Sequence, residues 1–222
     1  MQVSSTDPQK GPLVSSDPSP TGRTVRMPRD ERRRQLLSAA HKVFVDSGYH
    51  GASMDEIAEL AQVSKPVLYQ HFPGKRDLYL AILDSHVESL LSKLLDAVQS
   101  TDNNKARVRA TIGAYFEFVA SDSQAHRLLF ESDVARDPDV AERLENFNQT
   151  FAEAVSRVVH DQTSLPESSS ILLGHALIGM SQVAARAWLD QERSVDLETA
   201  IDLVSRLAWR GIGRVDQEAP AE

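Results

Sequence analysis

The chain has 222 residues, 41% of them hydrophobic and 25% charged, and it contains no cysteine. This is the composition of an ordinary soluble protein, and it excludes disulfides, thiolate metal ligands and cysteine nucleophiles. Residues 1–76 hold eleven Lys and Arg against eight Asp and Glu, a charge of +3, whereas residues 77–222 hold thirteen against twenty-four, a charge of −11, so only the first part is suited to meeting phosphate.

The sequence predicts neither secretion nor membrane insertion. Its N-terminus lacks the apolar segment of a signal peptide, and no apolar run reaches the ~18 residues of a membrane-spanning helix. We therefore expect a cytoplasmic protein with no membrane partner.

Residues 1–28 are rich in Pro, Ser and Thr and have almost no apolar content. Such a segment cannot offset the entropy lost on ordering, so we expect a disordered polar arm. Arg23 and Arg26 near its end are candidates to touch DNA, and the alternative is a solvated tail.

A helix is predicted from Arg29, and Gly48 is placed to end it. Its apolar positions follow a helical period: Leu36, Leu37, Ala40, Val43 and Phe44. Four arginines crowd its first turn, at positions 29, 32, 33 and 34, where cations oppose the helix dipole. That arrangement favours either a nearby phosphate backbone or a solvated charged face.

The stretch from Ser53 to Arg76 predicts two short helices joined by a tight turn. Ser53 and Glu56 have the spacing of a capping box, in which each side chain bonds the other residue's amide. The buried stripe of the first helix is Met54, Ile57, Ala58 and Ala61. Ser64 is a second N-cap candidate, and Pro66 falls in the first turn, where proline is tolerated.

The second short helix carries a cation, a phenol, an amide and an imidazole on its outward side: Lys65, Tyr69, Gln70 and His71. Val63, Val67 and Leu68 supply its inward side. A short helix with this outward side is suited to reading base edges in a DNA groove.

The remainder predicts helices throughout, with no strand and no repeat. The expected ranges are 75–100, 105–121, 123–131, 137–161, 166–191 and 196–211. The fold class is therefore all-α. We divide the chain into a polar arm (1–28), a helix-turn-helix domain (29–76), a ligand-binding and dimerisation domain (77–214) and a frayed tail (215–222).

No catalytic motif occurs in the chain. The sequence lacks H-E-x-x-H, G-x-S-x-G, a P-loop and G-x-G-x-x-G, and its histidines are scattered. We expect no enzyme activity, no cofactor and no metal site. A carboxylate dyad has no sequence signature, so that alternative stays open.

Residues 29–83 resemble the N-terminal domain of TetR-family transcriptional regulators. The first helix ends in F-x-x-x-G-Y, and S-x-x-x-IA, V-S-x-x-x-LY-x-HF and a lysine at the head of a fourth helix follow in the family's order. Gln62 departs from the pattern, because the family usually has glycine in the turn. We expect a slightly different turn there.

The resemblance implies an all-helical protein of about nine helices. Three bind DNA, a fourth bridges to the second domain, and the rest bind a ligand and dimerise. It also implies a pseudo-palindromic, double-stranded operator, since a dimer places its two recognition helices about one helical turn apart.

The resemblance implies a set of DNA-binding positions. Ser53 and Lys75 match phosphate contacts at helix starts, and Tyr69 and His71 match a phosphate-gripping aromatic and imidazole. The remaining positions are placed to meet base edges and thymine methyls: Ser64, Lys65, Pro66, Val67 and Gln70.

Segments 122–133 and 179–190 extend the likeness to FasR-type regulators of fatty-acid synthesis, which respond to long-chain acyl-CoA. This implies a small hydrophobic or acyl-CoA ligand in an apolar tunnel. The candidate lining positions are Leu90, Leu94, Val98, Phe116, Phe130, Phe147, Phe151 and Ile178. The alternative for each is an ordinary core position. Lys105, Arg107 and Arg109 are candidates for the ligand's phosphates or simply a solvated helix start.

The family's dimer uses its last two long helices, and this chain has small residues in the first of them, which favours close packing with a second copy. The candidate dimer positions are Gly174, Ile178, Ser181, Ala185, Trp188, Leu203 and Leu207. An ordinary buried helix is the alternative. The resulting hypothesis is a homodimeric regulator of lipid-metabolism genes. The alternatives are a sensor of another hydrophobic molecule that controls efflux or catabolic genes, a constitutive DNA binder, or a lipid-binding protein with a vestigial helix-turn-helix.

Overall fold

The computed structural model describes residues 27–121, 123, 134, 137–163, 165–191 and 194–215. Within these residues the chain forms eight helices and no strand. They are α1 (Arg29–Gly51), α2 (Met54–Leu60), α3 (Lys65–His71), α4 (Lys75–Gln99), α5 (Asn104–Ser121), α7 (Pro138–Gln162), α8 (Glu167–Asp190) and α9 (Leu197–Val215). The all-α prediction is confirmed. Residues 1–26, the tail after Val215 and all of the expected 123–131 helix except Ser123 lie outside the described residues.

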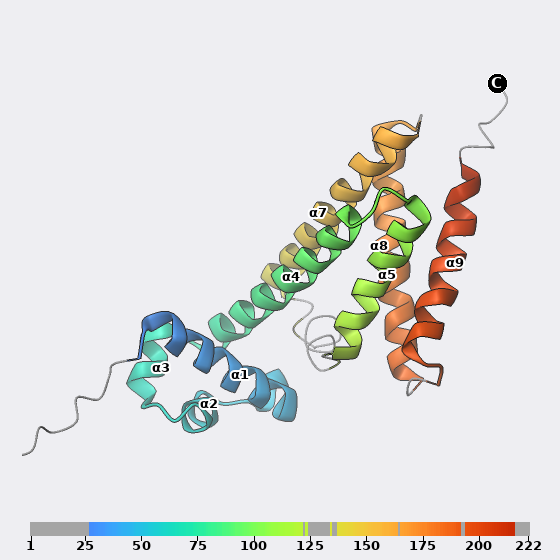
Figure 1. Ribbon diagram of the computed structural model, residues 1–222. Helices are drawn as coiled ribbons and strands as arrows, with labels where there is room; N and C mark the ends of the chain where they lie inside the picture. The colour runs from blue at the N-terminus through green and yellow to red at the C-terminus, as the bar shows by residue number, and fades with distance from the viewer. Residues whose placement is uncertain are drawn as a thin grey trace, which may run out of the picture.

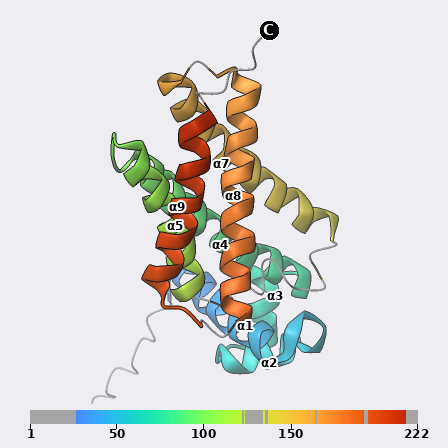
Figure 2. The same ribbon diagram turned by 90° about the vertical axis from the view of Figure 1, so that its right-hand side faces the viewer.

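Helices α1, α2 and α3 gather at one end of the molecule (Figures 1 and 2). Their buried side chains form one core with the start of α4, through Leu36, Phe44, Ile57, Leu68 and Leu78. Gly48 interrupts α1 with φ 68° and ψ 169°, a backbone conformation that is essentially restricted to glycine. The predicted end of the first regular helix at Gly48 is therefore confirmed.

Helix α4 joins this end to the rest of the molecule (Figure 1). At its start, Tyr79 is buried and makes edge contacts with Phe44 and Tyr49, at ring-centroid distances of 5.8 and 5.2 Å. Farther along, Leu90 and Leu94 are fully buried. One helix thus belongs to the cores of both parts, so a tilt of α4 moves α1–α3 relative to the helices beyond.

In the second part, α5 and α7 pack against α4, α8 packs mainly against α7, and α9 packs mainly against α5. Helices α7 and α8 approach each other closely at Gly174, where an added Cβ would lie 2.6 Å from the carbonyl oxygen of Ala152. Trp188 on α8 contacts Phe116 on α5 at a ring-centroid distance of 5.9 Å. No helix in the described ranges is long and apolar enough to cross a bilayer.

Helices α8 and α9 form one outer face, which is turned toward the viewer in Figure 2. Several large apolar side chains on this face remain exposed: Leu172, Val183, Leu203 and Leu207. Val183 is 71% and Leu207 67% exposed, so the face is unusually apolar for a surface in contact with water.

Candidate nucleic-acid interface

The start of α2 is fixed by Ser53. Its hydroxyl accepts a bond from the amide of Glu56 at 3.2 Å, and the carboxylate of Glu56 accepts one from the amide of Ser53 at 3.0 Å. The predicted capping box is therefore confirmed. Its consequence is that the Ser53 side chain stabilises the helix start whether or not a phosphate lies nearby.

The turn between α2 and α3 closes at Gln62. The amide of Val63 donates to the carbonyl oxygen of Ala58 at 3.0 Å. The amide of Gln62 donates to the carbonyl oxygen of Glu59 at 3.0 Å. This is the Schellman pattern, which requires a left-handed residue. Gln62 supplies it with φ 54°, the one non-glycine residue in the described ranges with positive φ. The expectation of a different turn is wrong, because the hydrogen bonds of the motif hold glutamine in the conformation that glycine prefers.

Helix α3 buries one side and presents the other. Leu68 is fully buried and Val67 is partly buried, whereas Lys65, Pro66, Tyr69 and Gln70 are exposed. Ser64 occupies the N-cap position, but its hydroxyl makes no capping bond. The exposed side therefore carries polar groups that the helix itself does not use.

Lys65 forms an ion pair across the turn. Its Nζ lies 2.7 Å from Oδ2 of Asp55, and both side chains are more than half exposed. The hydrogen bond and the charge of Asp55 raise the pKa of Lys65 above its ordinary value. Because exposed ion pairs contribute little to stability, Lys65 can exchange this partner for an acceptor on DNA at small cost.

A groove lies between the start of α1 and the exposed side of α3. It is lined by Met27, Pro28, Arg29, Arg32, Val67, Gln70 and His71. Desolvation, and then the charges of Arg29, Arg33 and Arg32, lowers the pKa of His71, so its imidazole is neutral at pH 7. The groove adds Arg29 and Arg32 to the candidate DNA contacts. Their crowding in the first turn of α1, against the helix dipole, was the sequence signal for them.

Lys75 turns toward the junction of α1 and α2. Its Nζ donates to the carbonyl oxygens of His50 at 3.2 Å and Ala52 at 2.9 Å, and it lies 4.8 Å from the centre of the Tyr49 ring. Lys75 thus fastens α4 to the N-terminal helices. Any phosphate contact at this position is made by an ammonium group that already has protein partners.

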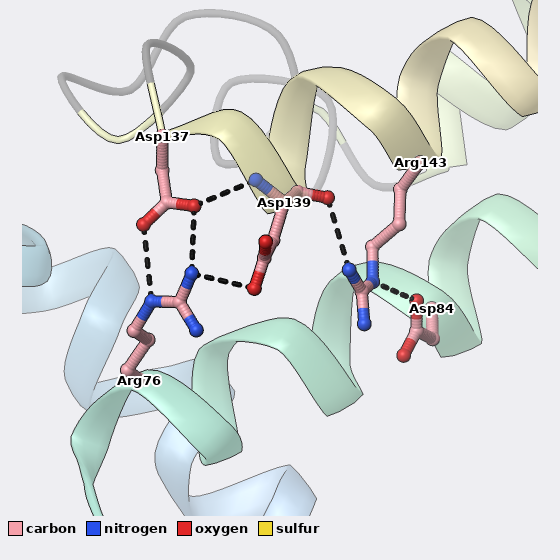
Figure 3. A network of polar contacts seen from close by, with 5 residues as sticks. All are labelled: Arg76, Asp84, Asp137, Asp139 and Arg143. Atoms are coloured by element: carbon pink, nitrogen blue, oxygen red, sulfur yellow. Dashed lines mark hydrogen bonds and ion pairs between the residues drawn. The ribbon is translucent and has the colours of Figure 1, made fainter.

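Two arginines tie α4 to the start of α7 (Figure 3). Arg76 bonds both carboxylate oxygens of Asp137, at 3.1 and 2.9 Å, and reaches Asp139 at 2.6 Å. Arg143 of α7 bonds Asp84 of α4 at 2.6 Å. These five residues, the α4–α7 ionic network, lie where the helix that carries α1–α3 meets the second part.

An apolar cavity of about 130 Å³ lies at the other end of α4. Its apolar lining consists of Val98, Val108, Val155, Val158, Val159, Leu165, Leu173, Leu177 and Trp209, and Asn104, Arg107, Thr111, Gln162 and Thr163 complete it. Of the predicted ligand positions, Val98 alone lines this cavity. The others that the structure describes are packed in the core: Leu90, Leu94, Phe116, Phe147, Phe151 and Ile178. Phe130 lies outside the described residues.

The predicted dimer positions divide between interior and surface. Five of them are buried in the interior of their own chain: Gly174, Ile178, Ser181, Ala185 and Trp188. Gly174 is small because the backbone of Ala152 lies against it, rather than to admit a second copy. Leu203 and Leu207 are exposed on α9, where a partner can reach them.

Comparisons with known proteins agree with this architecture. The model of "Bacterial regulatory proteins, tetR family" matches residues 36–82. The chain is 43% identical over 190 residues to the HTH-type transcriptional activator FasR of Mycolicibacterium smegmatis, which covers 86% of this chain and 87% of that protein.

Solved structures show the same fold. A TetR-like transcriptional regulator from Rhodococcus sp. RHA1 is 26% identical with a TM-score of 0.68, covering 85% of this chain and 99% of that one. FadR from Bacillus subtilis, solved in complex with stearoyl-CoA, is 18% identical with a TM-score of 0.66, covering 79% and 96%. At that identity the likeness to FadR concerns the fold alone.

Proposed function

Because the chain belongs to the TetR family of bacterial regulatory proteins and is a transcriptional regulator rather than an enzyme, we propose the finer function that follows. The protein binds a pseudo-palindromic operator as a homodimer. A long-chain acyl-CoA or another lipid-like molecule in the second domain modulates that binding. The genes under its control belong to lipid metabolism.

The observation that carries the DNA-binding proposal is the exposed side of α3. Tyr69 and Gln70 project from it, and the cationic groove of Arg29 and Arg32 runs beside it. Base edges are read by the polar side chains of a helix in the major groove, while flanking cations hold the phosphates. The basic N-terminal part carries this surface although the whole chain is acidic.

The outer face of α8 and α9 supports the homodimer. We assign the contact to Leu172, Ala176, Gly179, Val183, Leu203 and Leu207, which replace the five interior positions. A Cβ built at Gly179 meets nothing within 4 Å, so a second helix can approach closely there. Replacing Val183 by arginine is expected to convert the dimer to monomer, as measured by light scattering after size exclusion. Arg157→Glu, on the exposed side of α7, is the control and should remain dimeric.

The likeness to FasR supports the lipid ligand, and the cavity beside Val98 offers an apolar place for part of it. Typical ligand sites measure roughly 300–1,000 Å³, so this cavity has to widen when a whole acyl chain enters. Widening separates helices that pack on α4, and α4 carries the DNA-binding end.

A gel-shift experiment tests the proposal. DNA from upstream of the neighbouring genes is compared with an unrelated fragment of equal length, with and without palmitoyl-CoA. We expect a specific complex whose amount changes with palmitoyl-CoA. Equal binding to both fragments would refute operator recognition. A specific complex whose amount does not change with palmitoyl-CoA would refute this ligand and favour a constitutive regulator or a sensor of another molecule.

A further inference from the structure

The cavity contains one positively charged side chain among its lining residues. Arg107, at the end of the first turn of α5, lines the cavity together with apolar groups contributed by α4, α7, α8 and α9. A guanidinium bordering an apolar cavity is costly unless an anion or hydrogen-bond acceptors compensate it. The acceptors that Arg107 uses therefore determine what else it can bind.

The guanidinium of Arg107 donates hydrogen bonds to the last turn of α4 and to the loop that follows it. Its Nε donates to the carbonyl oxygen of Val98 at 2.8 Å, and its terminal nitrogens donate to the carbonyl of Thr101 and the side-chain oxygen of Asn104. A helix leaves its last carbonyls without intrahelical partners, and a cation there is favourable. Arg107 is thus a cap on the end of α4.

No carboxylate in the described part of the chain pairs with Arg107. A guanidinium has five N–H donors, and three are used in these bonds. Arg109, two residues on, differs because it is paired with Glu198 at 2.6 Å and is exposed. Arg107 therefore combines a full positive charge, spare donors and direct access to an apolar cavity.

We infer that Arg107 receives the anionic head of an aliphatic ligand whose chain enters this cavity against Val155, Leu173 and Leu177. This inference rests on the proposed ligand-responsive function and locates the polar end of the ligand. A carboxylate and a phosphate share the chemistry that a guanidinium recognises, two parallel N–H···O bonds.

Binding at Arg107 also acts on α4. The anion shares the guanidinium with the carbonyl oxygens of Val98 and Thr101 and draws it toward the cavity, so the cap on α4 weakens as the ligand binds. The aliphatic chain meanwhile widens a cavity of about 130 Å³ at the same end of that helix. Both effects loosen the far end of the helix whose near end holds α1–α3.

The test compares three twelve-carbon probes: laurate, lauroyl-CoA and dodecanol. Binding to the full chain is followed by the fluorescence of tryptophan, because Trp209 lines the cavity. Arg107→Gln is expected to weaken the binding of laurate, of lauroyl-CoA or of both by at least about tenfold, the usual effect of losing a charged hydrogen bond. The binding of dodecanol, which has no charge, should weaken by less than about twofold. Arg107→Lys should recover part of the loss, and Arg157→Gln, an exposed arginine on α7, should match wild type.

The outcomes separate the possible sources. If Arg107→Gln loses affinity for laurate alone, Arg107 binds a carboxylate head. If it loses affinity for lauroyl-CoA alone, Arg107 binds a phosphate. Equal binding of both anions by wild type and Arg107→Gln overturns the inference but leaves ligand sensing intact. An equal fall for all three probes also overturns it, because Arg107 would then only maintain the cavity. If wild type binds no probe, and palmitoyl-CoA leaves DNA affinity unchanged, the acyl-ligand proposal falls together with the inference.

Discussion

Tyr69 and Lys65 are the residues of α3 whose removal should affect DNA and little else. Tyr69 is 48% exposed, and the side chain of Lys65 pairs with the exposed Asp55. Alanine at either position is expected to weaken operator binding about tenfold while leaving the melting temperature within about 1 °C of wild type. Anisotropy titrations and thermal melts measure both quantities. Binding isotherms that overlay the wild type for both variants would refute the assignment.

Gln62 holds a left-handed conformation that costs a non-glycine residue free energy. Gln62→Gly should therefore stabilise the protein by about 0.5–1 kcal/mol, less than the full strain because glycine gains entropy in the unfolded chain. Gly48→Ala is the matched control, and it should destabilise the protein because it places a non-glycine residue at positive φ. No atom would crowd its Cβ, so any loss comes from φ 68° alone. Chemical denaturation measures both changes, and a destabilised Gln62→Gly would contradict the strain.

At the scale of single residues, local chemistry was predictable and distant partners were not. Ser53 with Glu56, and Gly48, follow from rules that span a few positions. The bonds from Lys75 to His50 and Ala52 join residues more than twenty positions apart, so no local pattern contains them. The same holds for the groove, which combines Arg29 and Arg32 with His71.

At the scale of helices, the sequence predicted their order and most of their ends. The expected ranges 75–100 and 166–191 compare with the observed Lys75–Gln99 and Glu167–Asp190. Pro73 and Gly74 precede the first of these helices and Pro166 precedes the second, so the signals at their starts were strong. Helix α9 continues to Val215 rather than stopping near Gly211, because an exposed glycine late in a helix costs only about 1 kcal/mol and does not by itself end it.

Gly174 should be the most sensitive glycine of α8. A methyl group there would lie 2.6 Å from the carbonyl oxygen and 2.7 Å from the Cα of Ala152, so α7 and α8 must separate. Gly174→Ala is expected to destabilise the protein by about 1–3 kcal/mol, the usual cost of overpacking. Gly113→Ala on α5 is the control, because its nearest contact would be an ordinary 3.8 Å with Ile201. Equal denaturation midpoints for the two variants would contradict the close α7–α8 contact.

The α4–α7 ionic network should transmit ligand binding rather than hold the fold. Its charged side chains are all partly exposed to solvent, which screens the ion pairs, so we expect the network to contribute little to stability. Arg76→Gln is expected to reduce the palmitoyl-CoA-induced change in DNA affinity by about threefold or more, with ligand-free affinity nearly unchanged. Anisotropy with and without palmitoyl-CoA gives both numbers, and an unaltered ligand response would exclude the network from the coupling.

The network's pH dependence follows from Asp137. Its bonds with Arg76 lower the pKa of that carboxyl below the ordinary 3.8. A lowered carboxyl pKa stabilises the folded state above the ordinary value, and the contribution disappears as the pH falls through the folded pKa. The ionic contacts therefore persist across neutral pH and do not act as a physiological pH switch.

At the scale of the whole molecule, the sequence identified an all-helical two-part regulator but not which side of α8 faces outward. That helix has small or apolar residues all round, so periodicity cannot separate the side against α7 from the side toward a partner. The packing of Gly174 against Ala152 and the burial of Ile178, Ala185 and Trp188 decide it. The cavity was likewise beyond prediction, since core and cavity positions share the same apolar side chains.

The central claim is that a lipid-like ligand in the second part controls DNA binding by the first. The most direct measurement is the fluorescence anisotropy of a labelled fragment from upstream of the neighbouring genes. It is titrated with the protein at several salt concentrations, with and without palmitoyl-CoA. We predict affinity that falls steeply with salt and changes at least about fivefold with palmitoyl-CoA. Affinity no greater than for an unrelated fragment, and unaltered by palmitoyl-CoA, would contradict the account.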